Sequence, residues 1–350
     1  MFPLEVPLRF LRGRAKGSQV VFDPFCGRGT TLYAARSQRM RAVGIDCSPV
    51  AVAISKAKLA NAAVEEAIEL STRILATVEP QHVPQGDFWR CAYHEVTLHE
   101  LCRLREGLMG CHDDDATVLL RAAILGILHG PKTKVGSYLS NQMQRTFAPK
   151  PAYAMKFWSE RRLKAARIDT KAALERKLRR IGYPSYPQPS GGWGDVYLGD
   201  SSKPETYAAL PPQIDAVVTS PPYYGMRTYV PDQWLRHWFL GGLAEVDYGY
   251  GGDLPSSSAA EFTESLAQTW SNIAARSANR LQMLVRFGSI PSRAVDARAI
   301  MLRSLDLSQA NWNVVSIRNA RTACEGKRQA AHMGRSGKPI DEFDLYAVLA

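Results

Sequence analysis

The chain has 350 residues, of which 45% are hydrophobic and 22% charged, an ordinary composition for a globular protein. No apolar run approaches the roughly 18 residues of a membrane span, and six cysteines without framework spacing indicate a reducing compartment, so we expect a cytoplasmic protein without a membrane partner. The net charge of +11 favours a polyanionic partner such as a nucleic acid.

Strand and helix patterns alternate in the N-terminal part of the chain. Residues 19–22 form a short apolar run that ends in an acid and a glycine turn, which predicts a buried strand. A helix is predicted over 30–39, a second strand over 41–46 and a second helix from 49 to about 70. This order predicts a parallel α/β sheet.

The middle of the chain has a different pattern. Residues 97–180 show mainly helical spacing, and Thr97 with Glu100 predicts a capping box at the start of one helix. A Pro-, Gly- and Ser-rich linker follows over 184–194. We therefore expect a helical insert within the α/β domain.

The α/β pattern then resumes to the end of the chain. The simplest architecture is one seven-stranded α/β sheet, divided by the insert into residues 1–75, 76–190 and 191–350. The later elements are strands at 196–198, 214–218, 281–287, 312–317 and 343–349, with a helix at 262–280.

The turn after the first strand has the character of a ligand loop. Gly27 and Gly29 let the backbone turn tightly, and the helix that starts at Thr30 offers free N–H groups. The loop matches neither the G-x-x-x-x-G-K nor the G-x-G-x-x-G phosphate pattern. A zwitterionic amino-acid tail fits better, because the N–H groups can face its carboxylate and Asp23 its ammonium.

Two further acids follow predicted strands. Asp46 ends the second strand, where a carboxylate can accept hydrogen bonds from two ribose hydroxyls. Asp200 ends a later strand and could accept from an adenine amino group. The alternative for Asp46 is a helix N-cap, a position for which Ser48 competes.

A Pro-Pro turn follows the apolar strand at 214–218. Its two prolines, Pro221 and Pro222, remove two N–H donors, so the Ser220 hydroxyl and the Pro221 carbonyl are presented as acceptors. Two acceptors that hold an aromatic amine's hydrogens localise the nitrogen lone pair, while Tyr223 can stack on the base. The alternative is a rigid polyproline-like linker.

These residues carry a family resemblance. The segment 23–31, DPFCGRGTT, resembles the F-x-G-x-G cofactor motif of the DNA amino-methyltransferases, and 219–223, TSPPY, resembles their S/D/N-P-P-Y/F catalytic motif. Residues 44–49 resemble the ribose-binding turn of that family, and 197–200 its adenine-side strand end. The resemblance covers about 1–75 and 195–350, in an alpha-like motif order.

The resemblance implies a Rossmann-like seven-stranded methyltransferase sheet with a mainly helical insert. Residues 1–75 would be the cofactor-binding half and 191–350 the catalytic half, around an insert that is a candidate for target recognition. The cofactor implied is S-adenosylmethionine. By this resemblance it is bound by Asp23, Phe25, Gly27, Gly29, Thr30, Asp46 and Asp200, and catalysis rests on Ser220, Pro221, Pro222 and Tyr223.

The implied activity is methylation of an exocyclic amino group on a DNA base. Serine in the catalytic motif favours cytosine N4, although adenine N6 enzymes also carry it. RNA base methylation is the alternative with the same chemistry, and a non-catalytic DNA-binding protein is a third possibility. Because a paired base cannot reach the methyl donor, the target base must flip out of the duplex.

The charge of the chain is concentrated in the insert. Residues 131–180 hold fourteen Lys and Arg against three acids, a net charge of +11. This segment is expected to contact double-stranded DNA, although a solvated surface is the alternative, and 318–338 form a second basic stretch. The candidate contacts are Lys156, Arg161, Arg162, Arg176, Lys177, Arg179 and Arg180, with Arg227 after the catalytic motif.

Aromatic and metal-ligating residues of the chain each allow two interpretations. Trp234 and Trp238 either hold the extruded base or pack in a core. The pairs Cys91/His94 and His99/Cys102 have zinc-like spacing, but they fall within a helical pattern of leucines. We therefore expect a packed helix there and no metal.

Overall fold

The computed structural model forms two compact units, a sheet unit and a helical unit. The sheet unit comprises Met1–Leu59, Tyr186–Thr228 and Gly252–Ala350, and the helical unit comprises Ala60–Ser185 and Tyr229–Gly251. The structure describes residues 2–13, 19–134, 136–145, 147–181, 193–211, 213–224, 230–247, 258–288, 295–320 and 342–350.

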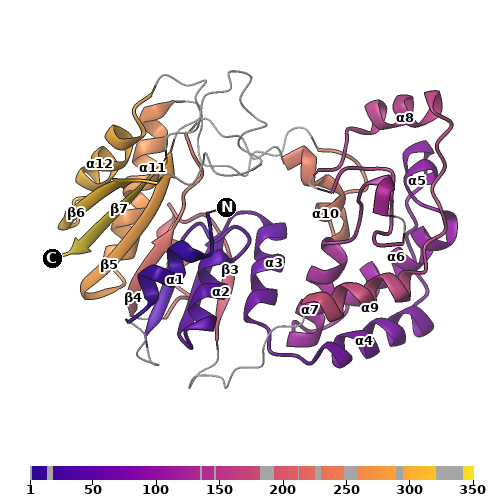
Figure 1. Cartoon of the computed structure of the whole chain (residues 1–350), viewed down its shortest axis with the longest axis horizontal. Helices are drawn as coiled ribbons and strands as arrows, with labels where there is room; N and C mark the ends of the chain where they lie inside the picture. The colour runs from indigo at the N-terminus through magenta and orange to yellow at the C-terminus, as the bar shows by residue number, and fades with distance from the viewer. Residues whose placement is uncertain are drawn as a thin grey trace. The chain divides into compact units, whose positions relative to one another are not determined.

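The sheet unit contains one seven-stranded sheet in the order β3-β2-β1-β4-β5-β7-β6 (Figure 1). The strands from β3 to β5 are parallel, whereas β7 runs antiparallel to both β5 and β6. This confirms the Rossmann-like sheet predicted from the sequence. The strands are β1 (Val20–Asp23), β2 (Arg41–Asp46), β3 (Gly194–Leu198), β4 (Ile214–Thr219), β5 (Ser277–Gly288), β6 (Trp312–Asn319) and β7 (Glu342–Leu349).

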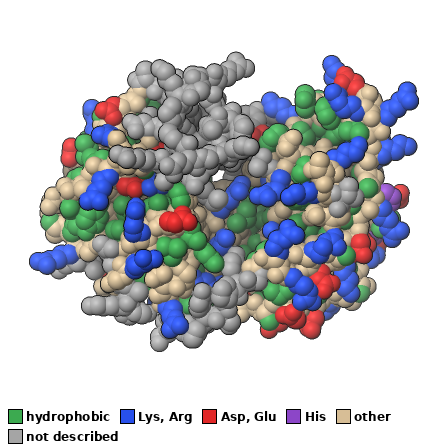
Figure 2. Space-filling view, in the orientation of Figure 1, with side chains coloured by type: hydrophobic (Ala, Val, Ile, Leu, Met, Phe, Trp, Pro, Cys, Tyr) green, Lys and Arg blue, Asp and Glu red, His purple; other side chains and the backbone are tan. Residues whose placement is uncertain are grey.

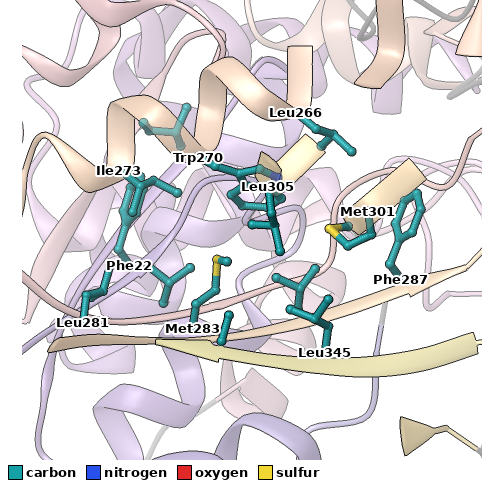
Figure 3. Packing of buried hydrophobic residues seen from close by; sticks show 14 of the residues in the cluster. Phe22, Leu266, Trp270, Ile273, Leu281, Met283, Phe287, Met301, Leu305 and Leu345 are labelled. Atoms are coloured by element: carbon teal, nitrogen blue, oxygen red, sulfur yellow. The ribbon is translucent and has the colours of Figure 1, made fainter. Parts of the chain in front are cut away.

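Helices cover both faces of this sheet because its strands are apolar on both sides. On β1, Val20 and Phe22 pack with α11 and α12, whereas Val21 packs with α1, α2 and α3. Figure 3 shows the first of these cores, where Trp270 of α11 lies among side chains from the strands. The helices are α1 (Glu5–Leu11), α2 (Thr30–Ser37), α3 (Pro49–Leu59), η2 (Pro204–Tyr207), α11 (Ala259–Ala274) and α12 (Ala297–Leu307).

The helical unit has its own aromatic core. Trp89 lies against Trp234 and Trp238, with ring centroids 5.6 and 4.6 Å away, and Phe88 packs on Trp158. The two tryptophans of α10 therefore pack in a core. The elements are α4 (Val64–Thr77), α5 (Asp87–Ala92), α6 (Glu95–Met109), α7 (Asp115–Leu125), η1 (Lys132–Lys134), α8 (Pro151–Glu160), α9 (Thr170–Ile181), η3 (Val230–Gln233) and α10 (Trp234–Phe239).

Three local predictions were wrong. The helix expected over 262–280 ends at Ala274, and β5 already begins at Ser277. The helix expected over 49–70 is two helices, because α3 ends at Leu59 and α4 begins only at Val64. The capping box was also misplaced. The α6 helix begins two residues earlier, with the His94 ring accepting from the Val96 N–H, and Thr97 is buried and accepts from the Ile168 N–H.

The helical unit is larger than the predicted insert. It begins at Ala60 rather than 76, because α4 packs on α7 and α9, and it also includes α10 from beyond the catalytic motif. The sequence pattern could not show that α10 packs in the helical unit, because its tryptophans contact residues about 145 positions earlier in the chain. Cys102 faces the interior of this unit, and His94 caps its helix.

Candidate active site

The predicted site residues meet at one edge of the sheet unit. Asp23 and Asp46 end β1 and β2, Asp200 follows β3, and Ser220 follows β4 directly. The four strands are neighbours and parallel, so their carboxyl ends share one edge. That edge is where open α/β sheets bind their ligands.

The glycine loop is held in a shape that leaves room for a ligand. Gly27 and Gly29 have φ of 53° and 71°, in the left-handed region that favours glycine. A Cβ at Gly27 would meet only the Phe25 carbonyl, 3.9 Å away, so the space above this residue is open. The α2 helix starts at Thr30 without a side-chain cap, which leaves N–H groups for a carboxylate.

Asp23 is the buried acid of the loop, with 1% of its surface exposed. Its Oδ1 accepts from the Thr219 hydroxyl at 2.6 Å and from the Phe25 N–H at 3.1 Å. Burial raises the pKa of Asp23 to about 6, against the hydrogen bonds that lower it. A cation placed beside this carboxylate would stabilise its charged form, as the ammonium of an amino-acid tail would.

Asp46 and Asp200 are held by backbone groups. The Asp46 oxygens accept one N–H each, from Gly27 at 2.8 Å and Ser48 at 2.9 Å, and burial raises its pKa. Asp200 Oδ1 accepts from the N–H and hydroxyl of Ser202, at 2.9 and 2.8 Å. Because a carboxylate has about four lone-pair positions, each acid retains acceptor capacity for hydroxyl or amino hydrogens.

The predicted catalytic motif is hydrogen-bonded to the first residue of β7. The phenol of Tyr223 donates to Glu342 Oε1 at 2.6 Å. Tyr223 is 9% exposed, and its ring meets Phe287 edge-on, with centroids 5.9 Å apart. The ring of Tyr223 thus packs in the core of the sheet unit, while its hydroxyl binds Glu342 at the start of β7.

Several residues of this site had no distinct signal in the sequence. Thr219 binds Asp23 across β1 and β4, and the Ser55 hydroxyl donates to the Gly27 carbonyl at 2.8 Å. Ser201 donates to the Pro24 carbonyl and so joins the end of β3 to the cofactor loop. Glu342 lies 119 residues from Tyr223 in the chain, a separation at which only the fold shows the contact.

The basic residues of the helical unit are largely on its surface. Lys156, Arg161, Arg162, Arg176, Arg179 and Arg180 are exposed, and Lys177 is half-buried. Figure 2 shows Lys and Arg side chains spread over this unit. Arg227 and most of the stretch 318–338 lie outside the described residues.

Three of the α9 cations, Arg176, Lys177 and Arg179, already contact other parts of the helical unit. Arg179 pairs with Glu65 at 3.1 Å and with Glu175 at 2.9 Å, and Arg176 donates to the Gly136 carbonyl. The chain of Lys177 lies over Gly126, whose Cβ would meet its Cε at 2.9 Å. These contacts compete with any phosphate contact on this helix.

The α8 helix presents an aromatic and cationic face instead. Tyr153 is 67% exposed, and its ring stacks on Phe157 with centroids 6.3 Å apart. The Arg161 guanidinium lies over the Phe157 ring, 4.0 Å from the ring centroid. With the exposed Lys156 beside them, these groups form an outward-facing stack at helical i, i+4, i+8 spacing.

Comparison with known proteins bears on the first part of the chain. Residues 1–57 match the family model described as DNA methylase. The resemblance drawn from the motifs is therefore confirmed over the segment that holds the cofactor loop and Asp46. This is an S-adenosylmethionine-dependent methyltransferase, and its residues 1–57 are similar to the DNA methylase family. No curated protein matches the chain in sequence.

Solved structures resemble this methyltransferase only weakly. An rRNA methylase from Streptococcus thermophilus has a TM-score of 0.37 and 8% identity, covering 100% of this chain and 97% of its own. Magnesium protoporphyrin IX methyltransferase from Synechocystis has a TM-score of 0.36 and 10% identity, and the match covers 99% of this chain and 78% of that protein. The rRNA methyltransferase aviRa from Streptomyces viridochromogenes has a TM-score of 0.31 and 13% identity, and the match covers 99% of this chain and 84% of that protein. Similarities of this size do not bear on the substrate.

The site fits the methyltransferase's cofactor. The open space over Gly27, the uncapped start of α2 and the buried Asp23 match a zwitterionic tail, while Asp46 and Asp200 offer acceptors farther along the edge. When bound, S-adenosylmethionine supplies an activated methyl group on a sulfonium.

The methyltransferase was also expected to lack a membrane span and a metal centre. In the ranges that the structure describes, every helix is too short or too polar to cross a bilayer. Within those same ranges, no three His, Cys, Asp or Glu side chains gather as they would around a metal ion. His99 instead lies 3.2 Å from Glu79, and burial raises the pKa of Cys102 to about 12.

Proposed function

We propose that this methyltransferase acts on an exocyclic amino group of a DNA base, with cytosine N4 as the preferred target and adenine N6 as the alternative. The observation that carries the proposal is the position of Ser220. It follows β4 directly, while Thr219, the last residue of that strand, is bonded to Asp23 of the cofactor loop at 2.6 Å. The acceptor loop and the methyl-donor loop are thus adjacent.

The chemistry follows from what this loop offers. Pro221 and Pro222 have no N–H, so the loop presents oxygens to an incoming amine. An aryl amine is a poor nucleophile, and acceptors that hold its hydrogens direct the lone pair towards the methyl carbon. Because the methyl group is already activated, positioning and electrostatics can carry the step without a covalent intermediate.

The direct experiment is methyl transfer from labelled S-adenosylmethionine to duplex DNA, single-stranded DNA and RNA. We expect label on DNA, recovered as N4-methylcytosine after digestion. Ser220→Ala should lower the rate on the order of 10²-fold through the loss of one transition-state acceptor, with cofactor affinity unchanged. Ser265→Ala, on the outer part of α11, is the matched control.

Other outcomes of that experiment select the alternatives. N6-methyladenine as the product would show that adenine is the target base. Label on RNA alone would show that the substrate is RNA rather than DNA. Binding of DNA without transfer by the intact chain would favour a non-catalytic role. A wild-type rate in Ser220→Ala would remove the serine hydroxyl from the mechanism.

The helical unit is proposed as the nucleic-acid contact, through the α8 face. Exposed aromatic rings stack on bases, and lysine and arginine side chains meet phosphates. Tyr153, Phe157 and Arg161 combine both kinds of group on one face.

The target base must also leave the duplex, because a paired base cannot reach the methyl donor. The fluorescence of 2-aminopurine at a verified target position should therefore increase on binding.

A further inference from the structure

The α8 helix is anchored to the helical unit by one of its faces. Ala154 and Trp158, one turn apart on that face, are buried. The Trp158 ring packs on Phe88 with centroids 5.4 Å apart, and its Nε1 donates to the Gln142 carbonyl at 3.1 Å. The side chains on the opposite face are therefore not needed to hold the helix in place.

The opposite face carries the α8 stack, formed by Tyr153, Phe157 and Arg161. The Tyr153 ring lies on Phe157 with 25° between the ring planes, and the Arg161 guanidinium lies over Phe157 as well. Because the three residues follow one another at steps of four, Tyr153 is the last layer of the stack. It is 67% exposed, so it offers the flat side of an aromatic ring to a further ring.

The turn that ends α8 contains an arginine in a backbone conformation that favours glycine. Arg162 has φ of 49°, and its N–H donates to the Ser159 carbonyl at 3.0 Å, while the Leu163 N–H donates to the Trp158 carbonyl at 2.9 Å. In this helix ending the left-handed residue is usually glycine, because a Cβ there is strained. Arg162 is exposed and contributes no packing that offsets the strain, so its guanidinium points to a contact outside the unit.

Cations surround the α8 stack. Residues 150–168 hold six Lys and Arg against one acid, Glu160, a net charge of +5. Glu160 lies 3.5 Å from Arg161, and Lys156, Arg162 and Lys164 are exposed. Lys and Arg side chains accordingly lie around hydrophobic ones at this end of the helical unit (Figure 2). A partner that fits this surface combines a flat aromatic ring with negative charge, as a nucleotide does.

We propose that the α8 stack is a binding site for an unpaired nucleobase, and that single-stranded DNA is the form of DNA that this methyltransferase binds most tightly. In a duplex both sides of a base are covered by its neighbours, so a single exposed ring finds no base to stack on, whereas the bases of a single strand can stack on aromatic side chains. A target that is already unpaired also spares the enzyme the cost of opening a duplex. The inference rests on the proposed function for the identity of the polymer as DNA.

The test measures equilibrium binding of the full chain to one sequence as single-stranded DNA, blunt duplex DNA and single-stranded RNA. Tyr153→Leu keeps an apolar side chain without the ring, and Tyr153→Phe is the matched control that keeps the ring. We expect Tyr153→Leu to weaken binding of single-stranded DNA about tenfold, the worth of one base–aromatic stack, and binding of the duplex less than about twofold. Tyr153→Phe should bind both as wild type does. The fluorescence of 2-aminopurine along the single strand should fall on binding to wild type and Tyr153→Phe, and fall less with Tyr153→Leu.

Arg162→Gly distinguishes a binding site from a solvated surface. Glycine suits the left-handed backbone, so the thermal midpoint should not fall, while loss of a phosphate contact should lower the slope of log affinity against log salt by about 0.7 for single-stranded DNA. A wild-type slope in Arg162→Gly would overturn the proposal. So would tighter binding of the duplex, binding of RNA alone, or a Tyr153→Leu variant that binds single-stranded DNA as wild type or loses both forms of DNA equally.

The binding measurements need no methyl transfer, so the two proposals can fail separately. A chain that binds single-stranded DNA through Tyr153 but transfers no methyl group would sink the proposed function and leave this inference standing. A chain that methylates DNA with unchanged binding in Tyr153→Leu would do the reverse.

Discussion

At the scale of single residues, Asp23 shows a conflict between stability and binding: its charged form is the one that would bind the cofactor's ammonium, but burial of that charge destabilises the fold. Its pKa is about 6 in the fold and near 3.8 when exposed, so the native state holds more protons between these values. Stability must therefore fall as pH rises from about 4 to 6, by about 3 kcal/mol at 1.36 kcal/mol per pKa unit. This stability is fully present below pH 3.8 and absent above 6, the reverse of a salt-bridged carboxylate.

Asp23→Asn tests this conflict. An amide can still accept from Thr219 and Phe25 but never ionises, so the variant should gain up to about 3 kcal/mol in free energy of unfolding at pH 7 relative to its effect at pH 4. Urea unfolding at both values measures the difference, in which other titrating groups cancel. Cofactor affinity should rise with pH through about 6 in wild type and stay flat in the variant. An equal stability effect at both pH values would contradict the buried charge.

At the scale of elements, the edge strand β3 depends on one glycine. Gly194 has φ +105°, and a Cβ there would lie 1.8 Å from the Ala42 carbonyl oxygen of β2. Gly194→Ala should lower the free energy of unfolding by about 3 kcal/mol, from left-handed strain and overpacking together. Gly86→Ala is the matched control, since Gly86 has φ +109° with nothing within 4 Å. Thermal unfolding compares the two, and equal losses would mean that strain alone acts.

The same strand shows how far the sequence could predict the fold. Apolar runs located the central strands β1, β2 and β4, because their side chains are buried on both faces, and Asp23 and Asp46 at the ends of β1 and β2 followed from the strand positions. The antiparallel placement of β7 and the pairing of Arg286 with Asp344 depend on register, which no local pattern contains. The contact from Tyr223 to Glu342 was beyond prediction for the same reason. The split between α3 and α4 was missed because residues 60–63 are not strong helix breakers.

At the scale of the whole molecule, the net charge of +11 equals the charge of residues 131–180, so any contact with a polyanion is expected there. The structure divides these cations into two groups. Those on and after α8 are exposed beside the aromatic stack, while Arg179 on α9 is bonded to two glutamates and Arg176 to a carbonyl. An existing pair must be broken, or its charge shared, before such a residue can release a counterion from DNA.

Two fourfold alanine variants therefore separate the helices at equal charge. One replaces Lys156, Arg161, Arg162 and Lys164, and the other replaces Arg176, Lys177, Arg179 and Arg180. Each phosphate contact contributes about 0.9 to the slope of log affinity against log salt, so the first variant should flatten the slope by up to four such steps and the second by fewer. Cofactor affinity measured by calorimetry should be the same in both. A wild-type slope in the first variant, or a larger change in the second, would mean that α8 faces solvent in the complex and that the nucleic acid lies along another surface.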